Sequence, residues 1–455
     1  MSATKKILQQ LRDFESRNVT FIEPDGSWPI VWERARGVHV WDLAGKKYLD
    51  LTAAFGVAAA GHANTKVGRA GQQQMAKLLH AMGDVHPHAL KARLACQLSR
   101  LTFERWSVAA NVSSRQTSTP KSSPAPSLPA TGKTIFANSG FEAVEAALKT
   151  ALLATGKPGV IAFEGAYHGL GYGALSTTHR GHFRRPFQSQ LGGFGHFAPF
   201  PTLGGHSPRS SLQNVEACLH KIFRRHKIGA ILVEPVQARG GINVPPPEFL
   251  PLLRKLCDEN RALLILDEIY TGFGRTGKWF ACEHTQTIPD LICLGKALTG
   301  GFPLSACVGR ADLMDAAWPA SSGEAIHTST FLGHPVGCAM ALAQIAEIER
   351  RKLPARAAAL GKFLLAELSK IQSRKSRLVS TPRGLGLLAG MELNLPDGKP
   401  ATQIALNAIK SLLHRGYIFL PEGEHANVIS FTPPLTIAKT QLTQAVVELQ
   451  KVLAS

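Results

Sequence analysis

Short apolar segments alternate with helical patterns between Lys133 and Gly309, and this alternation constrains the fold more than any other feature of the sequence. Strands separated by helices usually assemble into a mostly parallel sheet with helices on its faces. We therefore predict an α/β fold whose large domain contains such a sheet. The expected strands are Thr134–Ala137, Val160–Phe163, Ala230–Val233, Leu263–Leu266, Leu291–Leu294 and Ala306–Val308.

The segments outside this region predict a smaller α+β domain made from both ends of the chain. Residues 1–20 have an amphipathic helical pattern, and Pro29–Leu51 alternates as a hairpin that turns at Asp42–Lys46. The other patterns are helices in residues 66–105 and from Val336 to Lys370, then mixed strands and helices from Leu378 to Ser455.

The predicted boundaries follow from these patterns. Residues 1–65 are the N-terminal part of the small domain, 66–345 the large domain, and 346–455 the C-terminal part of the small domain. Within the large domain, Val108–Ala130 is rich in Ser, Thr and Pro, a composition typical of a mobile surface insertion.

The composition disfavours several classes of protein. Of the 455 residues, 44% are hydrophobic, and no apolar run approaches the roughly 20 residues of a membrane span. The seven cysteines lack a CxxC pair, which is typical of a reducing cytoplasm and not of a disulfide or zinc framework. The net charge of +19 comes from dispersed basic residues, which favours anionic small molecules over nucleic acid. We expect a cytoplasmic protein with no metal site and no nucleic-acid or membrane partner.

Polar residues follow the expected strands where they end. The ends read Asn138-Ser-Gly, Glu164-Gly-Ala-Tyr-His-Gly, Glu234-Pro-Val-Gln, Asp267-Glu-Ile-Tyr and Gly295-Lys. In an open α/β sheet, ligands bind outside the carboxyl ends of the strands. The sequence therefore predicts one site in which a phosphate-binding turn, an aromatic ring, carboxylates and a lysine converge.

Lys296 stands where an apolar strand stops, just before Gly300, Gly301 and Pro303. A lysine held between buried segments can have its pKa lowered by desolvation and become a nucleophile. Taken alone, a solvated loop lysine is the commoner interpretation. The polar residues at the neighbouring strand ends favour the reactive lysine.

Two other strand ends have open interpretations. Asp267 follows four apolar residues, so its carboxylate needs a partner, which could be a protonated ring nitrogen, an arginine or a helix N-cap. Ser139 and Glu142 have the spacing of a capping box, and a helix N-terminus there would also present N–H groups to a phosphate. A plain capping box is the alternative.

A nearby glycine motif predicts no nucleotide site. Gly272-Phe-Gly-Arg-Thr-Gly277 matches G-x-G-x-x-G, but Asp267-Glu268 separates it from the strand and no clean helix follows. A dinucleotide fingerprint needs strand, glycines and helix in immediate succession. We interpret the motif as a glycine-rich turn.

Four motifs, in this order, resemble the class III aminotransferases, which are fold-type I enzymes that use pyridoxal 5'-phosphate. The resemblance extends from Trp32 to the last helix, with the Ser/Pro-rich insertion outside it. The motifs are Asn138-Ser-Gly-Phe-Glu-Ala-Val-Glu-Ala-Ala, Asp267-Glu-Ile-Tyr-Thr-Gly-Phe-Gly-Arg-Thr-Gly, Gly295-Lys-Ala-Leu-Thr-Gly-Gly-Phe-Pro-Leu-Ser-Ala and His327-Thr-Ser-Thr-Phe-Leu-Gly-His-Pro.

The resemblance implies roles around the cofactor ring. Lys296 matches the lysine that holds the cofactor as a Schiff base and shuttles the proton, and Asp267 matches the partner of the pyridine nitrogen. Tyr167 matches the aromatic residue on one face of the ring, and Ile269 should pack on the other. His168 is expected among the cofactor contacts.

The resemblance also implies how the phosphate is held. Ser139, Gly140 and Phe141 match the phosphate-binding turn. Ser329 and Thr330 match a segment that reaches the phosphate of the neighbouring subunit, which implies a homodimer with shared active sites.

Departures from the family pattern concern the substrate. Ornithine and acetylornithine members have an arginine where this chain has Leu170, and a paired glutamate and arginine where it has Arg239 and Ser430. We hypothesise that Arg239 supplies the positive charge for a substrate carboxylate; the alternative is an arginine that points to solvent or pairs with an acidic residue.

Further candidate residues complete the expected site. Tyr270 replaces the family's glutamine near the cofactor's phenolic oxygen, and its hydroxyl could substitute for the amide. Phe55 and Glu234, with Arg239 and Ser430, are the candidate substrate contacts.

The expected activity is ping-pong transfer of an amino group from an amine or (ω-)amino acid donor to a keto acid or aldehyde. The expected partners are therefore small-molecule amines and keto acids. An amino acid racemase or epimerase on the same cofactor is the alternative enzyme. A cofactor-binding regulatory homologue is the non-enzymatic alternative, disfavoured because Lys296, Asp267 and the phosphate turn are all present.

Overall fold

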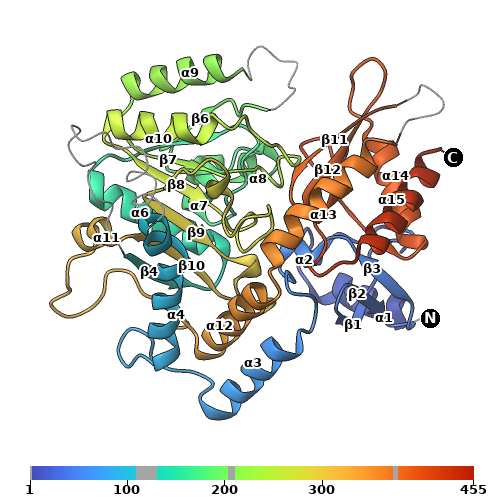
Figure 1. Ribbon diagram of the computed structural model, residues 1–455, viewed down its shortest axis with the longest axis horizontal. Helices are drawn as coiled ribbons and strands as arrows, with labels where there is room; N and C mark the ends of the chain where they lie inside the picture. Colours follow the sequence, from blue (N-terminus) through green and yellow to red (C-terminus); the bar gives the residue numbers. More distant parts are fainter. Residues whose placement is uncertain (1–2, 109–130, 203–210, 372–377, 455) are drawn as a thin grey trace.

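A seven-stranded sheet forms the centre of the large domain, with strand order β4-β10-β9-β8-β7-β5-β6. The computed structural model describes residues 3–108, 131–202, 211–371 and 378–454 (Figure 1). The strands are β4 (Gly132–Ala137), β5 (Gly159–Phe163), β6 (Gly195–Ala198), β7 (Ile228–Val233), β8 (Leu263–Asp267), β9 (Leu291–Leu294) and β10 (Ser305–Arg310). The predicted α/β fold with a mostly parallel sheet is confirmed. Two details differ: β6 was not expected, and β10 runs antiparallel to both β4 and β9.

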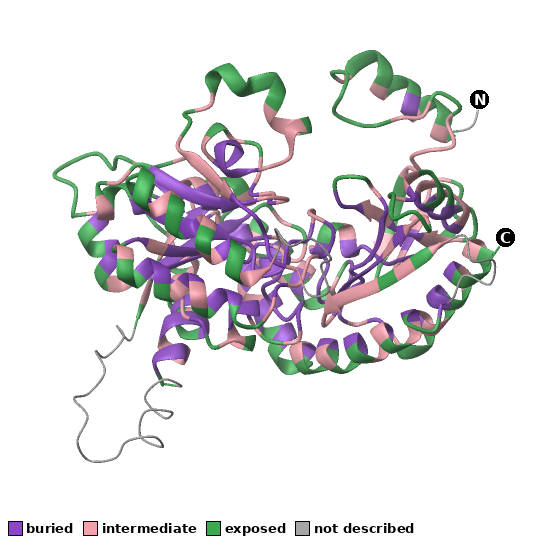
Figure 2. Cartoon of the chain, turned by 90° about the horizontal axis from the view of Figure 1, so that it is seen from above, coloured by how far each residue is buried: buried purple, intermediate pink, exposed green. Residues whose placement is uncertain are grey.

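Helices cover both faces of this sheet, because alternate strand residues point to opposite sides. On one face, Leu264 and Leu266 pack with α4 (Ala89–Ser99), α9 (Leu212–Arg225) and α10 (Phe249–Asn260). On the other face, Ile265 packs with α6 (Gly140–Thr155). Figure 2 shows the buried residues concentrated along the strands and the exposed residues on the outer sides of the helices. Because both faces are covered, ligands reach the sheet at its strand ends.

Both ends of the chain contribute to one smaller sheet (Figure 1). The predicted hairpin is present as β2 and β3, with the carboxylate of Asp42 accepting hydrogen bonds from the N–H groups of Ala44 and Lys46 in its turn. The C-terminal strand β13 then pairs with β3 in parallel. The strands of this sheet are β1 (Trp32–Arg36), β2 (His39–Asp42), β3 (Lys47–Asp50) and β13 (Tyr417–Ile418). The domain boundaries themselves stay a prediction.

A second small sheet is entirely C-terminal and antiparallel, with strand order β11-β12-β15-β14. The edge strand β14 ends at Glu422. The N–H of the next residue, Gly423, donates to the carbonyl of Arg239 in the large domain (3.1 Å). The strands are β11 (Val379–Leu385), β12 (Leu388–Asn394), β14 (Leu420–Glu422) and β15 (Val428–Phe431). The helices of this part of the chain are α13 (Leu353–Leu368), α14 (Thr402–His414) and α15 (Lys439–Ala454).

The expected helical region 66–105 contains α3 and α4, separated by residues 78–88, and α4 is followed by a π-helical segment, Arg100–Glu104. The predicted insertion at 108–130 lies outside the described residues, apart from Val108. Within the described ranges, no helix has the length and apolar content needed to traverse a lipid bilayer. The remaining helices are α1 (Ala3–Phe14), α2 (Ala53–Gly56), α3 (Thr65–Lys77), α7 (Tyr172–Thr177), α8 (Gly181–Arg184), α11 (Ala311–Ala317) and α12 (Pro335–Arg350).

Candidate active site

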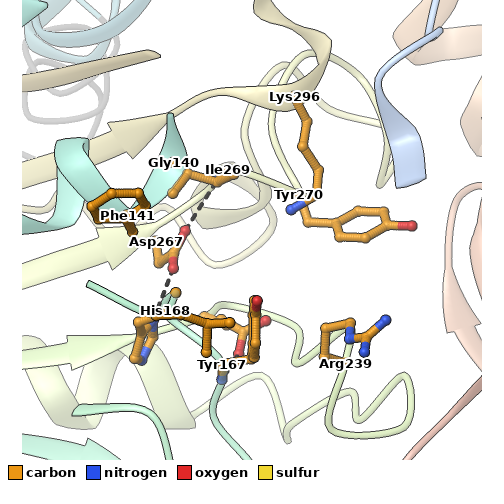
Figure 3. Close-up of a pocket in the computed structure, with 12 residues that line it drawn as sticks. Gly140, Phe141, Tyr167, His168, Arg239, Asp267, Ile269, Tyr270 and Lys296 are labelled. Carbon is orange, nitrogen blue, oxygen red and sulfur yellow. Dashed lines mark hydrogen bonds and ion pairs between the residues drawn. The ribbon is translucent and has the colours of Figure 1, made fainter. Parts of the chain in front are cut away.

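A pocket of about 420 Å³ opens at the carboxyl ends of the central strands (Figure 3). The predicted convergence of an aromatic ring, carboxylates and a lysine is therefore present. The pocket is lined by Gly140, Phe141, Tyr167, His168, Gly169, Leu170, Glu234, Arg239, Asp267, Ile269, Tyr270 and Lys296. Five predicted residues are absent from this lining: Phe55, Ser139, Ser329, Thr330 and Ser430.

Asp267 ends β8 as a buried carboxylate with two partners. Its Oδ2 lies 2.8 Å from His168 Nδ1, and its Oδ1 accepts a hydrogen bond from the Ile269 N–H (3.1 Å). The backbone N–H of His168 donates to Thr178 Oγ1 (2.9 Å). The sequence had suggested a cofactor ring nitrogen, an arginine or a helix N-cap as the partner; the protein itself supplies a histidine instead, which orients the acid.

Lys296 begins a short 3₁₀ turn directly after β9. Its φ of +25° is in the left-handed region, which a side chain other than glycine adopts at an energetic cost. Its Nζ lies 4.5 Å from the centroid of the Tyr270 ring (Figure 3). Burial lowers the pKa of the Lys296 amine, although the charges of Asp267 and Glu234 oppose this effect. A larger fraction of neutral, nucleophilic amine follows.

The start of α6 is organised by Ser139 and Glu142. The predicted capping box is present, with the Glu142 carboxylate accepting hydrogen bonds from the N–H (2.7 Å) and Oγ (3.0 Å) of Ser139. Ser305 Oγ donates to the Ser139 carbonyl (2.6 Å), which ties this turn to β10. A Cβ on Gly140 would lie 3.0 Å from Ile269 Cδ1, so only glycine fits here without displacing that side chain.

Glu234 holds the Tyr167 segment in place. Its carboxylate oxygens accept hydrogen bonds from the N–H groups of Tyr167 (3.0 Å) and Ala238 (3.2 Å). Burial raises the pKa of Glu234 to about 7, although the nearby His168 and these hydrogen bonds favour its charged form. The carboxylate expected to contact substrate thus also positions the aromatic ring.

Arg239 lines the pocket and also faces a carboxylate. Its guanidinium lies 5.7 Å from the centroid of the Tyr167 ring, and its Nε lies 3.6 Å from Glu422 Oε2. The alternative interpretation, pairing with an acidic residue, is therefore observed, whereas the role of Arg239 toward a substrate carboxylate stays a prediction. Sequence reasoning missed Glu422, because only the pairing of β14 with β15 brings it here.

The other predicted residues have different surroundings. Phe55 is 49% exposed, in α2. Ser430 is buried and donates to the carbonyl of Leu420 (3.0 Å). The Tyr270 hydroxyl donates to Thr432 Oγ1 (3.2 Å), so the ring and not the hydroxyl faces Lys296.

Ser329 and Thr330 lie between α11 and α12 and remain partly or fully exposed. The reach of this pair to a neighbouring subunit stays a prediction. The glycine motif at residues 272–277 forms turns, as expected. Within it, Arg275 is fully buried and donates to the carbonyls of Leu387 and Pro433.

The chain is similar to characterised enzymes over nearly its whole length. It is 36% identical to the 5-aminovalerate aminotransferase DavT of Pseudomonas aeruginosa, covering 91% of each chain. It is also 36% identical to a putrescine aminotransferase of Pectobacterium atrosepticum, covering 94% of this chain and 83% of that one. An amine transaminase from an uncultivated Pseudomonas species, solved in a PLP-bound form, has a TM-score of 0.81 at 27% identity, covering 97% of this chain and 98% of that one.

The family comparison agrees with these relatives. The model described as aminotransferase class-III matches residues 22–453, which include the whole pocket. The chain therefore belongs to the class III aminotransferases, the fold-type I enzymes that depend on pyridoxal 5'-phosphate.

Proposed function

We propose that this aminotransferase takes the amino group from the terminal carbon of an amine or ω-amino acid and transfers it to a keto acid or aldehyde. The observation that carries this proposal is the placement of charge in the pocket. Arg239 is the one arginine among the described lining residues, and it lies across the pocket from Asp267 (Figure 3). The walls near Asp267 include the apolar side chains of Ile269 and Phe141.

This arrangement suits an amine whose carboxylate, if present, is remote. An α-amino acid carries a carboxylate on the reacting carbon, and an arginine next to that carbon is the usual partner for it. Where ornithine and acetylornithine members have an arginine, this pocket is lined by Leu170. Both 5-aminovalerate and putrescine, named for two relatives, carry a primary amine at the end of an unbranched chain. The relatives therefore support the same substrate class.

The pocket residues fit pyridoxal 5'-phosphate, which, when bound, supplies an electron sink for the carbanion. The fit depends on an amine with a lowered pKa, a buried acid for the ring nitrogen, and Gly140, where an added Cβ would lie 3.0 Å from Ile269 Cδ1. We assign the phosphate to the α6 N-terminus at Ser139, Gly140 and Phe141, where the helix dipole favours an anion.

The protein's own residues then orient the reaction. Lys296 would hold the cofactor and would move the proton to and from the substrate carbon. Asp267 would keep the ring nitrogen protonated, and His168 keeps the Asp267 carboxylate in position. Tyr167 and Ile269 would contact the ring, and Glu234 positions Tyr167 through its backbone N–H.

We also propose a homodimer in which Ser329 and Thr330 reach the partner's phosphate site. Exposed apolar side chains support an interface where residues 78–85 meet the segment before α12, as shown by the ring contact of His80 with Phe331 (5.4 Å). These exposed side chains are Leu78, Leu79, Met82, Val85, Ile326 and Phe331. Seven free cysteines support a cytoplasmic location.

A donor panel without any acceptor tests the proposed reaction. We expect 5-aminovalerate, putrescine and butylamine to change the absorbance of the bound cofactor in a single turnover, whereas alanine reacts at least tenfold more slowly. A racemase or epimerase would leave the cofactor form unchanged after turnover. A preference for alanine over all three terminal amines would refute the proposed substrate class.

A further inference from the structure

Glu422 forms an incomplete ion pair with Arg239, which lines the pocket. The side chain is only 4% exposed, and its Oε2 lies 3.6 Å from Arg239 Nε. Neither atom has a hydrogen-bond partner among the described residues. A buried carboxylate that lacks such a partner is poorly compensated for the loss of water. The pair is therefore able to change its charge or its partner when a ligand arrives.

The charges around Glu422 come from several elements. Arg239 follows β7, and Arg180 lies between α7 and α8; both guanidiniums act on Glu422. The Nε of Arg180 also lacks a hydrogen-bond partner within the described ranges. Lys296 adds a third favourable charge, while Glu234 opposes ionisation. Two guanidiniums thus share one buried carboxylate, which leaves positive charge for a second anion.

Two further groups complete these surroundings. Tyr270 also interacts with Glu422. Its hydroxyl stays protonated, because burial raises the pKa of Tyr270 to about 12. Glu424 is exposed to solvent, two residues further along the chain, and interacts with Arg180. Its charge is screened by water.

Burial makes Glu422 responsive near neutral pH. It raises the pKa of the carboxyl group to about 7, although Arg239 and Arg180 favour its charged form. A ligand carboxylate at Arg239 would place a second negative charge on the same guanidinium. Two carboxylates that share one site cannot both remain charged at low cost, so the pKa of one of them rises. The buried carboxylate is the one that takes the proton.

We propose that Glu422 takes up one proton from solvent when a carboxylate binds at Arg239, and thereby makes carboxylate binding depend on pH. The inference rests on the proposed function in one respect: it takes the bound carboxylate to be the remote end of an ω-amino acid or keto acid. Below about pH 7, Glu422 is already neutral and Arg239 is free to bind the anion. Above that pH, each bound carboxylate requires a proton, so its affinity falls about tenfold per pH unit.

Proton uptake by the holoenzyme tests this coupling without any turnover. The probe is pentanoate, an unreactive carboxylate, titrated calorimetrically in two buffers that differ in ionisation enthalpy. With a pKa of about 7, we expect uptake of about 0.1 proton at pH 6 and about 0.9 at pH 8, and an affinity about tenfold weaker at pH 8.

Two variants separate the coupling from other effects of pH. Glu422→Gln imitates the neutral acid, so pentanoate should bind without proton uptake and with equal affinity at pH 6 and pH 8. Glu424→Gln is the matched control on the same segment and should behave as the wild type. Circular dichroism and thermal unfolding confirm that both variants are folded.

Each outcome supports or overturns the proposal. Wild-type binding without uptake at pH 8, unchanged uptake in Glu422→Gln, or no binding of pentanoate at either pH would overturn it. The donor panel distinguishes failure of the proposed function from failure of the proton-uptake proposal, since putrescine and butylamine carry no carboxylate. An enzyme that is inactive with those amines but shows Glu422-dependent proton uptake would refute the proposed function alone.

Discussion

Replacing Gly140 by alanine tests how closely the start of α6 packs against the side chain of Ile269. The new Cβ would lie 3.0 Å from Ile269 Cδ1 and 3.1 Å from Cγ2, so Ile269 must shift by a few tenths of an ångström. Overpacking costs about 1–3 kcal/mol, whereas alanine gains about 0.5–1 kcal/mol over glycine in a helix. We expect Gly140→Ala to lower the free energy of unfolding of the apoprotein by about 1 kcal/mol.

A second substitution shows whether Ile269 is the cause. Ile269→Val removes Cδ1 and alone costs about 0.5–1.5 kcal/mol. In the double variant the two changes should compensate, with a coupling energy of about 1 kcal/mol. Urea unfolding measures these values. Gly68→Ala in α3 is the control, because its Cβ meets nothing within 4 Å and it should be neutral or stabilising.

The same variants connect packing with cofactor binding. In Gly140→Ala, the displaced Ile269 intrudes into the pocket, so affinity for pyridoxal 5'-phosphate should fall about three- to tenfold in a fluorescence titration, equivalent to about 0.7–1.4 kcal/mol. The double variant should recover most of this loss. A Gly140→Ala protein as stable as wild type, with coupling below about 0.3 kcal/mol, would refute the packing argument.

Other substitutions test the remaining parts of the site and fold. Lys296→Ala should show no cofactor mass after borohydride reduction, whereas wild type should retain it; equal labelling would place the attachment elsewhere. His168→Asn should weaken cofactor binding about tenfold by releasing Asp267; unchanged affinity in a fluorescence titration would contradict this role. Arg275→Met leaves two buried carbonyls unpaired and should cost about 3 kcal/mol in urea unfolding. As the pH rises from 5 to 7, the apoprotein should lose up to about 3 kcal/mol of stability through Glu422, whose pKa is raised from 4.5 to about 7, because the native state binds more protons than the unfolded state there. In urea titrations, Glu422→Gln should remove this part of the slope and leave the part that comes from Glu234, whose pKa is also raised to about 7.

The parts of the site that follow from local pattern were predictable. Asp267 ends the apolar strand β8, Lys296 follows β9 after one glycine, and parallel strands must bring their carboxyl ends to one edge. The antiparallel direction of β10 was not predictable in this way. Its apolar residues resemble those of its parallel neighbours, and only the short connection from β9 could have indicated the reversal.

Contacts between distant segments were the least accessible to sequence reasoning. Glu422 has no local motif, and it reaches Arg239 only through the register of the C-terminal sheet. The orientation of the Tyr270 hydroxyl similarly depends on Thr432, which lies 162 residues away. No pattern within a single element encodes such distances. These distant contacts shape the part of the pocket that we propose for the substrate, whereas the predictable ones form the part that we propose for the cofactor.

The parallel pairing of β3 with β13 has a consequence for how the polypeptide is synthesised. Lys46, just before β3, donates to the carbonyl of His414, just before β13, across 368 residues. The segment β1–β3 therefore leaves the ribosome long before β13, the strand that completes their sheet, has been synthesised. Until then β3 has an unpaired edge, which can recruit another chain. We expect nascent chains that stall before Tyr417 to be bound by chaperones at this edge.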